Sequence, residues 1–267
     1  MRAALHSLIC AACVLDETQL ERWIAMRGLP SAILLVACLA LGGCATAPPG
    51  TGGSDVNDPY ESTNRAIFDF NQKLDRDFML PTAEFYVDVV PGPARQGVHN
   101  FLSNLNLPVV FVNDVLQGEA TRAAQDMGRF GLNTTFGIGG LFDPATKWGV
   151  PEHDEDFGQT LGVWGVGEGP YMVLPLLGPD PPRDAFGQVA DIFMDPWTYV
   201  SIREHFYWSA AREYTAIVDL RSRNIDTLND IERTSVDYYA TMRSLYLQMR
   251  QNQINNGKTD VENLPNF

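Results

Sequence analysis

The stretch 29–44 limits which part of this chain can fold, because it has the layout of a bacterial lipoprotein signal. Arg27 precedes an apolar run that ends at Leu41, and two glycines stand directly before Cys44. A secretory signal combines a charged beginning, an apolar segment of about 7–15 residues and small residues at the cleavage site. A transmembrane helix would need about 20 apolar residues. We therefore expect cleavage before Cys44 and acyl chains on it. The alternative is an ordinary secretory signal in which Cys44 is incidental.

The first 25 residues do not suit the charged beginning of such a signal, because acidic residues are among them: Asp16, Glu17 and Glu21. Met26 followed by Arg27 begins a signal of ordinary length. We therefore predict that translation starts at Met26, that residues 1–25 are an over-extended reading frame, and that residues 26–43 are the signal peptide.

All four cysteines lie at or before the predicted cleavage site: Cys10, Cys13, Cys38 and Cys44. Cys10-x-x-Cys13 has the spacing of a redox or metal motif, but it falls in a segment that we do not expect to fold. The mature chain is therefore predicted to have no disulfide and no cofactor other than the lipid on Cys44.

The charge balance excludes several classes of partner. The chain carries a formal net charge of −14, and removal of residues 1–43 leaves this unchanged because three basic and three acidic residues are lost. Nucleic acid would be repelled by so acidic a protein. Electrostatic adsorption to anionic lipid is also disfavoured, so membrane contact beyond the acyl anchor must come from apolar surface.

Residue patterns divide the mature chain into three parts. Residues 44–57 are rich in glycine, proline, serine and threonine and are predicted to form a flexible tether. Residues 58–254 have helical periodicity over most of their length, and residues 255–267 are a polar tail that we expect to be mobile. Asp58 is expected to cap the first helix, with Pro59 in its first turn and Glu61 completing a capping box.

The expected helices are bounded by proline and glycine. They cover 58–80, 82–90, 93–107, 109–118, 119–132, 184–193, 202–220 and 227–254. The segment 109–116 is rich in valine and could be a strand by propensity, but its apolar spacing and the following Gly118 favour a helix.

The segment 131–187 is dense in glycine and proline, yet it is too apolar for a solvated loop. Either protein or lipid must cover it. One interpretation is an irregular part of the core. The other is an apolar hairpin that enters a bilayer or gates a passage, with glycines as flexible points.

Catalytic and metal motifs are missing from the sequence. The mature histidines, His99, His153 and His205, lack metal-ligand spacing, and the run Glu152-His153-Asp154-Glu155-Asp156 lacks the glycine of a calcium loop. No G-x-S-x-G element is present, and Gly165-x-Gly167-x-Gly169 lacks the lysine of a phosphate loop. We therefore predict no enzyme activity and no metal site.

A series of short motifs between Asp58 and Val200 resembles the MlaA (VacJ) family of outer-membrane lipoproteins. These are Asp58-Pro59-Tyr60-Glu61, Asn64-Arg65, Phe70-Asn71, Pro91-x-Pro93-Ala94-Arg95-x-Gly97, Asn100-Phe101, Leu116-Gln117-Gly118, Arg129-Phe130-x-x-Asn133-Thr134, Gly137-x-Gly139-Gly140, Asp143, Phe157-Gly158-x-Thr160-Leu161-Gly162, Gly165-Val166-Gly167-x-Gly169-Pro170-Tyr171, Leu174-Pro175, Gly178 and Arg183-Asp184. The helices after Ile202 match in kind only.

The resemblance implies an all-α, ring-shaped domain with a Gly/Pro-rich apolar hairpin, embedded in the inner leaflet of the outer membrane. It implies removal of mislocalised phospholipid from the outer leaflet through an amphipathic channel, transfer to a periplasmic carrier protein (MlaC-like), and association with a trimeric porin. Two rival functions remain: a lipoprotein scaffold that binds porins without moving lipid, and a periplasmic lipid hydrolase whose nucleophile is not evident in the sequence.

The resemblance also suggests site residues. Gly137, Gly139 and Gly140 would lie at the base of the hairpin, and Gly165 and Gly167 at hinge points. Three arginines are candidate phospholipid headgroup contacts, with structural ion pairs as the alternative: Arg95, Arg129 and Arg183.

Overall fold

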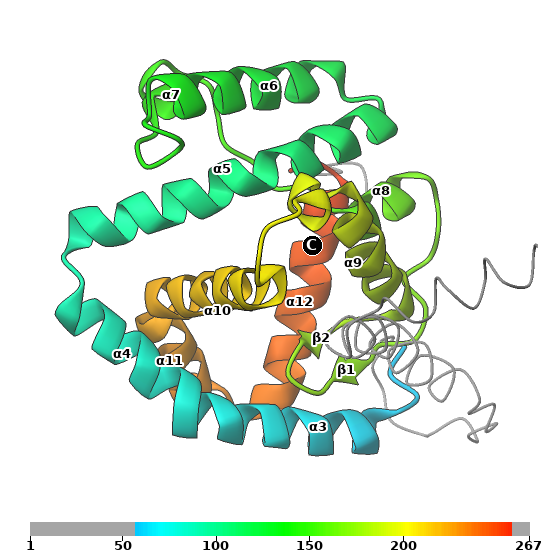
Figure 1. Cartoon of the computed structure of the whole chain (residues 1–267). Coiled ribbons are helices and arrows are strands. Elements are labelled where there is room, and N and C mark those ends of the chain that lie inside the picture. The colour runs from blue at the N-terminus through cyan, green and yellow to red at the C-terminus, as the bar shows by residue number, and fades with distance from the viewer. Residues whose placement is uncertain (1–56, 258–267) are drawn as a thin grey trace, which may run out of the picture. The chain divides into compact units, whose positions relative to one another are not determined.

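The computed structural model describes residues 57–257 (Figure 1). The predicted signal peptide, Cys44, almost all of the tether and the tail from residue 258 lie outside the described residues. Within 57–257 the fold is helical, and the only strands are two of two residues each. The expected all-α class is therefore confirmed.

The first helical stretch continues through the proline at which we expected it to end. Helix α3 (Glu61–Leu74) passes through a π-helical turn, η1 (Asp75–Met79), into α4 (Leu80–Val89). The Leu80 amide donates to the Asp75 carbonyl five residues earlier. Proline lacks the amide hydrogen that an α-helix uses, and the wider π-turn directly before Pro81 accommodates that loss.

The predicted capping box of α3 is wrong. Tyr60 is the N-cap residue and makes no side-chain cap. The Asp58 carboxylate instead accepts hydrogen bonds from Asn64 of α3 and from Tyr239 and Arg243 of the C-terminal helix. A charged partner stabilises a buried carboxylate more than a backbone amide does, so tertiary contacts displace the local cap.

The next two helices pack side by side along much of their length. Helix α5 (Gly92–Gln117) runs without interruption through Pro108, where we expected a break, and ends as predicted at Gly118, whose φ is +79°. Helix α6 (Ala120–Thr135) follows after a tight turn. The segment 109–116 is helical, as its apolar spacing indicated.

The glycine- and proline-rich centre contains only short elements. Helices α7 (Pro144–Lys147) and α8 (Phe157–Val163) precede two strands, β1 (Val173–Leu174) and β2 (Gly178–Pro179). The strands are antiparallel, and Val173 pairs with Pro179. Asn64 and Asn71 of α3 bind the backbone of this hairpin through their side-chain amides.

The C-terminal part contains α9 (Pro182–Met194), the 3₁₀-turn η2 (Pro196–Tyr199) and α10 (His205–Arg223). The single helix that we expected over 227–254 is divided into α11 (Ile225–Thr234) and α12 (Tyr238–Ile254). The break lies at Ser235, and Asp237 caps α12 by accepting from the Ala240 amide. In Figure 1, α10 lies between α4 and α5, and it contacts both.

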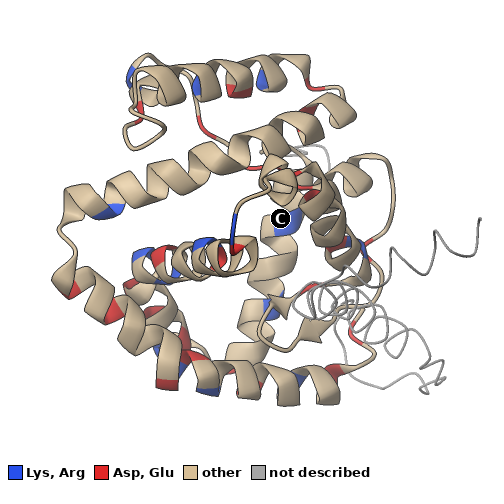
Figure 2. Ribbon diagram, viewed as in Figure 1, with Lys and Arg blue, Asp and Glu red and all other residues tan. Residues whose placement is uncertain are grey.

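The apolar core is small and lies where α3, the hairpin and α12 meet. Phe68, Tyr171, Val173 and Tyr239 form it, with their rings in edge-to-face contact. Buried polar and charged side chains do much of the remaining packing, as Asp114, Asp126 and Arg129 illustrate. Figure 2 shows that charged residues of both signs are spread over the helices, with several along α10.

No helix between residues 57 and 257 combines the length and apolar character that crossing a bilayer requires. Many large apolar side chains are nevertheless exposed. They gather in the α6–α7 region (Phe136, Ile138, Leu141, Phe142, Trp148), after α8 (Trp164, Val166), at the hairpin tip (Leu176, Leu177), on α9 (Phe186, Phe193) and at the start of α10 (Phe206, Tyr207, Trp208).

Candidate functional site

A cavity between α5 and α10, which we call the α5–α10 cavity, has a volume of about 920 Å³. Its walls come from α5, the segment 154–159, α9, η2 and α10, together with one residue of α12. They include His99, Leu102, Ser103, Asn106, Val109, Asp154, Asp156, Asp191, Ile192, Asp195, Trp197, His205, Ser209, Arg212, Ala216, Asp219, Leu220 and Arg223. Apolar and charged side chains therefore line the same space.

One charged group on the wall centres on Asp219 of α10. Its Oδ2 lies 3.0 Å from His99 Nδ1 of α5 and accepts a hydrogen bond of 2.9 Å from Arg223 Nε. Burial alone would raise the pKa of Asp219, but the bonds from His99 and Arg223 outweigh it and hold the pKa below its usual value. The carboxylate thus stays ionised and ties α10 to α5.

A second group joins η2 to α10. The Trp197 indole N–H donates to Ser209 Oγ at 2.9 Å, and the ring of His205 stacks on Trp197 with centroids 5.8 Å apart. Arg212 donates to Asp195. Arg212 and Asp195 are thus paired with each other, and this side of the cavity offers hydrogen-bonding groups beside apolar carbon.

Asp191 of α9 is an exception to ionic pairing. It accepts only from neutral donors, the Asn113 amide group and the Phe157 backbone N–H. Burial raises the pKa of Asp191. Its carboxylate fixes α9 against α5 and the start of α8, and so sets one side of the cavity.

The predicted hairpin glycines lie in a compact turn after α6, and none of them lines the cavity. A Cβ on Gly137 would overlap the Phe142 carbonyl oxygen, and one on Gly140, at φ +95°, would lie 2.6 Å from Asn104 Cβ. Gly139 has a φ of +69° and open space around it. Close packing therefore explains Gly137 and Gly140 without a hinge.

The two predicted hinge glycines after α8 differ from each other. Gly165 has a φ of +87°, in the left-handed region that favours glycine, and a Cβ added to it would meet nothing within 4 Å. Gly167 also has open space but no positive φ. The backbone conformation therefore favours glycine at Gly165 but not at Gly167.

Two of the three candidate headgroup arginines are used inside the fold. Arg129 is 2% exposed and binds the Asp143 carboxylate, the Thr146 hydroxyl and the Val150 carbonyl. Its side chain thereby connects α6 to the segment around α7. Arg129 is therefore used in a structural ion pair with Asp143, the alternative to a headgroup contact.

Arg183 is also buried, and it binds the Asp184 carboxylate beside it on α9. Arg95, in the first turn of α5, is half-buried, and its Nε has no hydrogen-bond partner within residues 57–257. It does not line the cavity. Of the three, only Arg95 stays a candidate headgroup contact.

Sequence reasoning did not identify the cavity residues, because no local motif marks them. They come from helices separated by up to about 150 positions. The three histidines of the predicted mature chain each have a different acidic or polar partner. His99 and His205 reach the cavity, whereas His153 lies between Asp114 and Asp126.

Known proteins resemble this chain over most of its length. The sequence model of a family described as "MlaA lipoprotein" matches residues 56–253. A Haemophilus influenzae protein named "Intermembrane phospholipid transport system lipoprotein MlaA" is 34% identical over 238 residues, which cover 86% of this chain and 93% of the relative. The Escherichia coli protein of the same name is 34% identical over 245 residues, covering 87% and 94%.

A solved structure gives the same picture at the level of the fold. It is described as "Structural basis for maintenance of bacterial outer membrane lipid asymmetry" and is 37% identical to this chain. The match covers 72% of this chain and 96% of that one, with a TM-score of 0.66.

Proposed function

The chain belongs to the MlaA lipoprotein family, and from this we propose that it is an outer-membrane component of a phospholipid transport system. It removes mislocalised phospholipid from the outer leaflet and passes it to a periplasmic carrier protein, so that the lipid asymmetry of the outer membrane is maintained. Both relatives named above carry phospholipid transport in their names.

The observation that carries the proposal is the mixed lining of the α5–α10 cavity. Paired charged groups such as Asp219 with Arg223 can hydrogen-bond a phospholipid headgroup, while Leu102, Ile192 and Trp197 offer apolar contact to its acyl chains. Its volume of about 920 Å³ lies within the range of small-molecule sites, about 300–1,000 Å³. Movement of a lipid along such walls needs no covalent step, so we propose no enzyme activity.

We propose two modes of membrane attachment. Acyl chains on Cys44 contribute about 0.8 kcal/mol for each buried methylene, and two or more chains give stable anchoring. The exposed aromatic residues near α7 and at the start of α10, such as Trp148 and Phe206, would enter the inner leaflet of the outer membrane. Exposed apolar patches of this kind mark membrane or protein contact sites.

The same exposed surfaces are available to protein partners. We propose that a trimeric porin covers part of them and that a soluble MlaC-like carrier receives the lipid on the periplasmic side. Arg95 is a candidate headgroup contact outside the cavity.

The anchoring part of this proposal is tested in cells. Phospholipid in the outer leaflet is measured in cells that lack the gene and in the same cells carrying the wild type or Cys44→Ala. We expect a rise on deletion that the wild type reverses and Cys44→Ala does not. An unchanged outer leaflet on deletion would refute the proposal.

The cavity part is tested with a bulky substitution. Ala216 of α10 lines the cavity, whereas Ala210 of the same helix is exposed and does not. We expect Ala216→Trp to leave outer-leaflet phospholipid high and Ala210→Trp to restore it to the wild-type level. If Ala216→Trp restores it fully while the chain still copurifies with porin, the protein is a scaffold that binds porins without moving lipid.

A further inference from the structure

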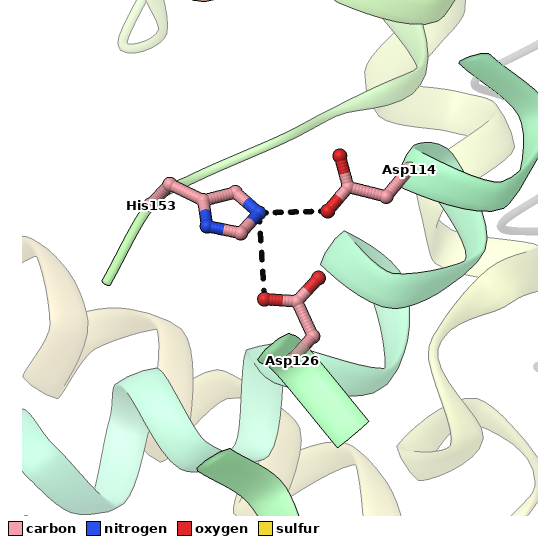
Figure 3. Close-up of side chains that lie close together, drawn as sticks. All are labelled: Asp114, Asp126 and His153. Carbon is pink, nitrogen blue, oxygen red and sulfur yellow. Dashed lines mark hydrogen bonds and ion pairs between the residues drawn. The ribbon is translucent and has the colours of Figure 1, made fainter. Parts of the chain in front are cut away.

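Three side chains outside the α5–α10 cavity converge on one buried point (Figure 3). Asp114 lies near the end of α5, Asp126 lies in α6, and His153 lies in the segment between α7 and α8. His153 Nε2 is 2.7 Å from Asp114 Oδ2 and 3.4 Å from Asp126 Oδ1. One ligand atom from each residue lies within 4.8 Å of the others.

The Asp126 carboxylate is 0% exposed, yet neither of its oxygens has a hydrogen-bond partner within the described chain. His153 is the positive group beside it, at ion-pair distance. A buried carboxylate without donors is costly, and native proteins usually supply it with a hydrogen bond, a countercharge or a metal ion.

The local charge balance leaves room for a cation. Asp114, Asp126 and Glu155 are acidic, whereas Arg122, which binds Asp114 and Glu155, is the one permanent positive charge among these neighbours. With His153 protonated, the five side chains sum to −1. With a divalent ion bound and His153 neutral, the charges of the five side chains and the ion together sum to zero.

We propose that Asp114, Asp126 and His153 form a structural site for a divalent transition-metal ion such as Zn²⁺. Zinc accepts histidine nitrogen and carboxylate oxygen at about 2.0–2.2 Å, in a tetrahedral arrangement whose ligand atoms lie about 3.4 Å apart. Asp126 already has this separation from His153, and Asp114 needs to move outwards by less than about 1 Å. A water molecule would complete the shell.

Such an ion would join three separate elements. It would hold the segment 150–156 against α5 and α6, and that segment supplies Asp154, Glu155 and Asp156 to the cavity wall. The three proposed ligands do not line the cavity, but the ion would fix the position of a segment that does. No local sequence motif indicates this site, because His153 and Asp114 are 39 positions apart.

The test uses the processed full-length lipoprotein, purified in detergent, stripped with a chelator and then mixed with Zn²⁺. We measure zinc per chain after gel filtration and the midpoint of thermal unfolding with and without the ion. We expect about one Zn²⁺ per wild-type chain and a higher midpoint. Asp126→Asn, which keeps the shape of the side chain, should bind at least ~10-fold more weakly, since even outer-shell changes cost about 10–100-fold.

His99→Gln is the matched control, because His99 forms a histidine–aspartate pair with Asp219 that offers no second carboxylate. This variant should bind zinc as the wild type does. Processing removes Cys10, Cys13 and Cys38 and leaves an acylated Cys44 in both proteins, so thiol-bound metal cannot produce a difference between wild type and Asp126→Asn. Equal binding by wild type and Asp126→Asn overturns the proposal.

X-ray absorption of the zinc-loaded wild type gives a second test that does not depend on a variant folding. We expect one imidazole and an otherwise oxygen shell, and a shell containing sulfur overturns the assignment. A wild-type chain that retains no zinc also overturns it, and the cluster would then be an ion pair of His153 with the two aspartates.

Discussion

Arg250 of α12 and Asp184 of α9 form a buried ion pair, in which Nη2 lies 2.8 Å from Oδ1 and both side chains are less than 10% exposed. The same guanidinium donates to both oxygens of Asp156, at the start of α8. Three helices from distant parts of the chain therefore depend on one side chain.

We expect Arg250→Met to lower the free energy of unfolding by about 3 kcal/mol, the lower end of the cost of breaking a buried ion pair. Arg250 is the partner of both Asp184 and Asp156, but Arg183 still faces Asp184 and Asp156 is partly exposed. Urea denaturation of the purified chain measures this. Arg233→Met is the control, since Arg233 pairs with Asp230 on the surface, and its loss should cost less than about 1 kcal/mol. Similar costs for the two variants would contradict the role of Arg250.

The position of the β-hairpin depends on Asn71 of α3. Its side chain donates to the Leu174 carbonyl and accepts from the Leu176 amide, at 2.9 and 2.8 Å. We expect Asn71→Ala to speed hydrogen exchange of the Leu176 amide while amides within α12 exchange as before. Asn100→Ala, which removes a bond to the Leu141 carbonyl, should leave Leu176 unchanged. Slow exchange of Leu176 in Asn71→Ala would show that other contacts hold the hairpin.

Gly165 and Gly167 form a matched pair, because both are exposed and have open space, but only Gly165 has a positive φ. We expect Gly165→Ala to lower the free energy of unfolding by about 1–2 kcal/mol, the cost of a left-handed conformation for an L-residue. Gly167→Ala should change it by less than about 0.5 kcal/mol. If both variants alter outer-leaflet phospholipid equally while only Gly165→Ala is less stable, flexibility at both positions matters in its own right.

Asp180, which follows β2, should make stability fall as the pH rises. Burial, and then the charge of Asp184, raise the pKa of Asp180 to about 7 in the folded chain, against about 3.9 in an unfolded one. Its contribution is therefore fully present below about pH 4 and is lost as the pH rises towards 7. We expect Asp180→Asn to be more stable than the wild type at pH 8, and the advantage to vanish near pH 4 in denaturation experiments.

Asp237 provides a control of opposite sign. Its hydrogen bond from Arg65 lowers the pKa of Asp237 to about 2. Its contribution is present above the unfolded pKa of about 3.9 and is lost as the pH falls towards 2. Asp237→Asn should therefore be less stable than the wild type at neutral pH, with the difference shrinking in acid. If the stability difference between a variant and the wild type does not change with pH, the pKa shift assigned to that residue is contradicted.

The sequence was sufficient wherever the signal is local. Apolar residues three and four positions apart predicted most helices, and Gly118 and the proline pair around Gly92 predicted where helices end. The expected class and family followed from the order of short motifs. The errors at Pro81 and Pro108 arose because the sequence rule for proline treats each helix alone, whereas neighbouring elements hold α4 and α5 in place.

The tertiary structure alone decided which side chains meet. Whether Arg129 binds a lipid or an aspartate, and whether His153 stands alone or between two carboxylates, depends on how α5, α6 and the following segment pack. The walls of the α5–α10 cavity depend on it in the same way. Periodicity reports which face of one helix is buried, but the partner across a helix interface can be any of a hundred residues, and only the packed fold selects it.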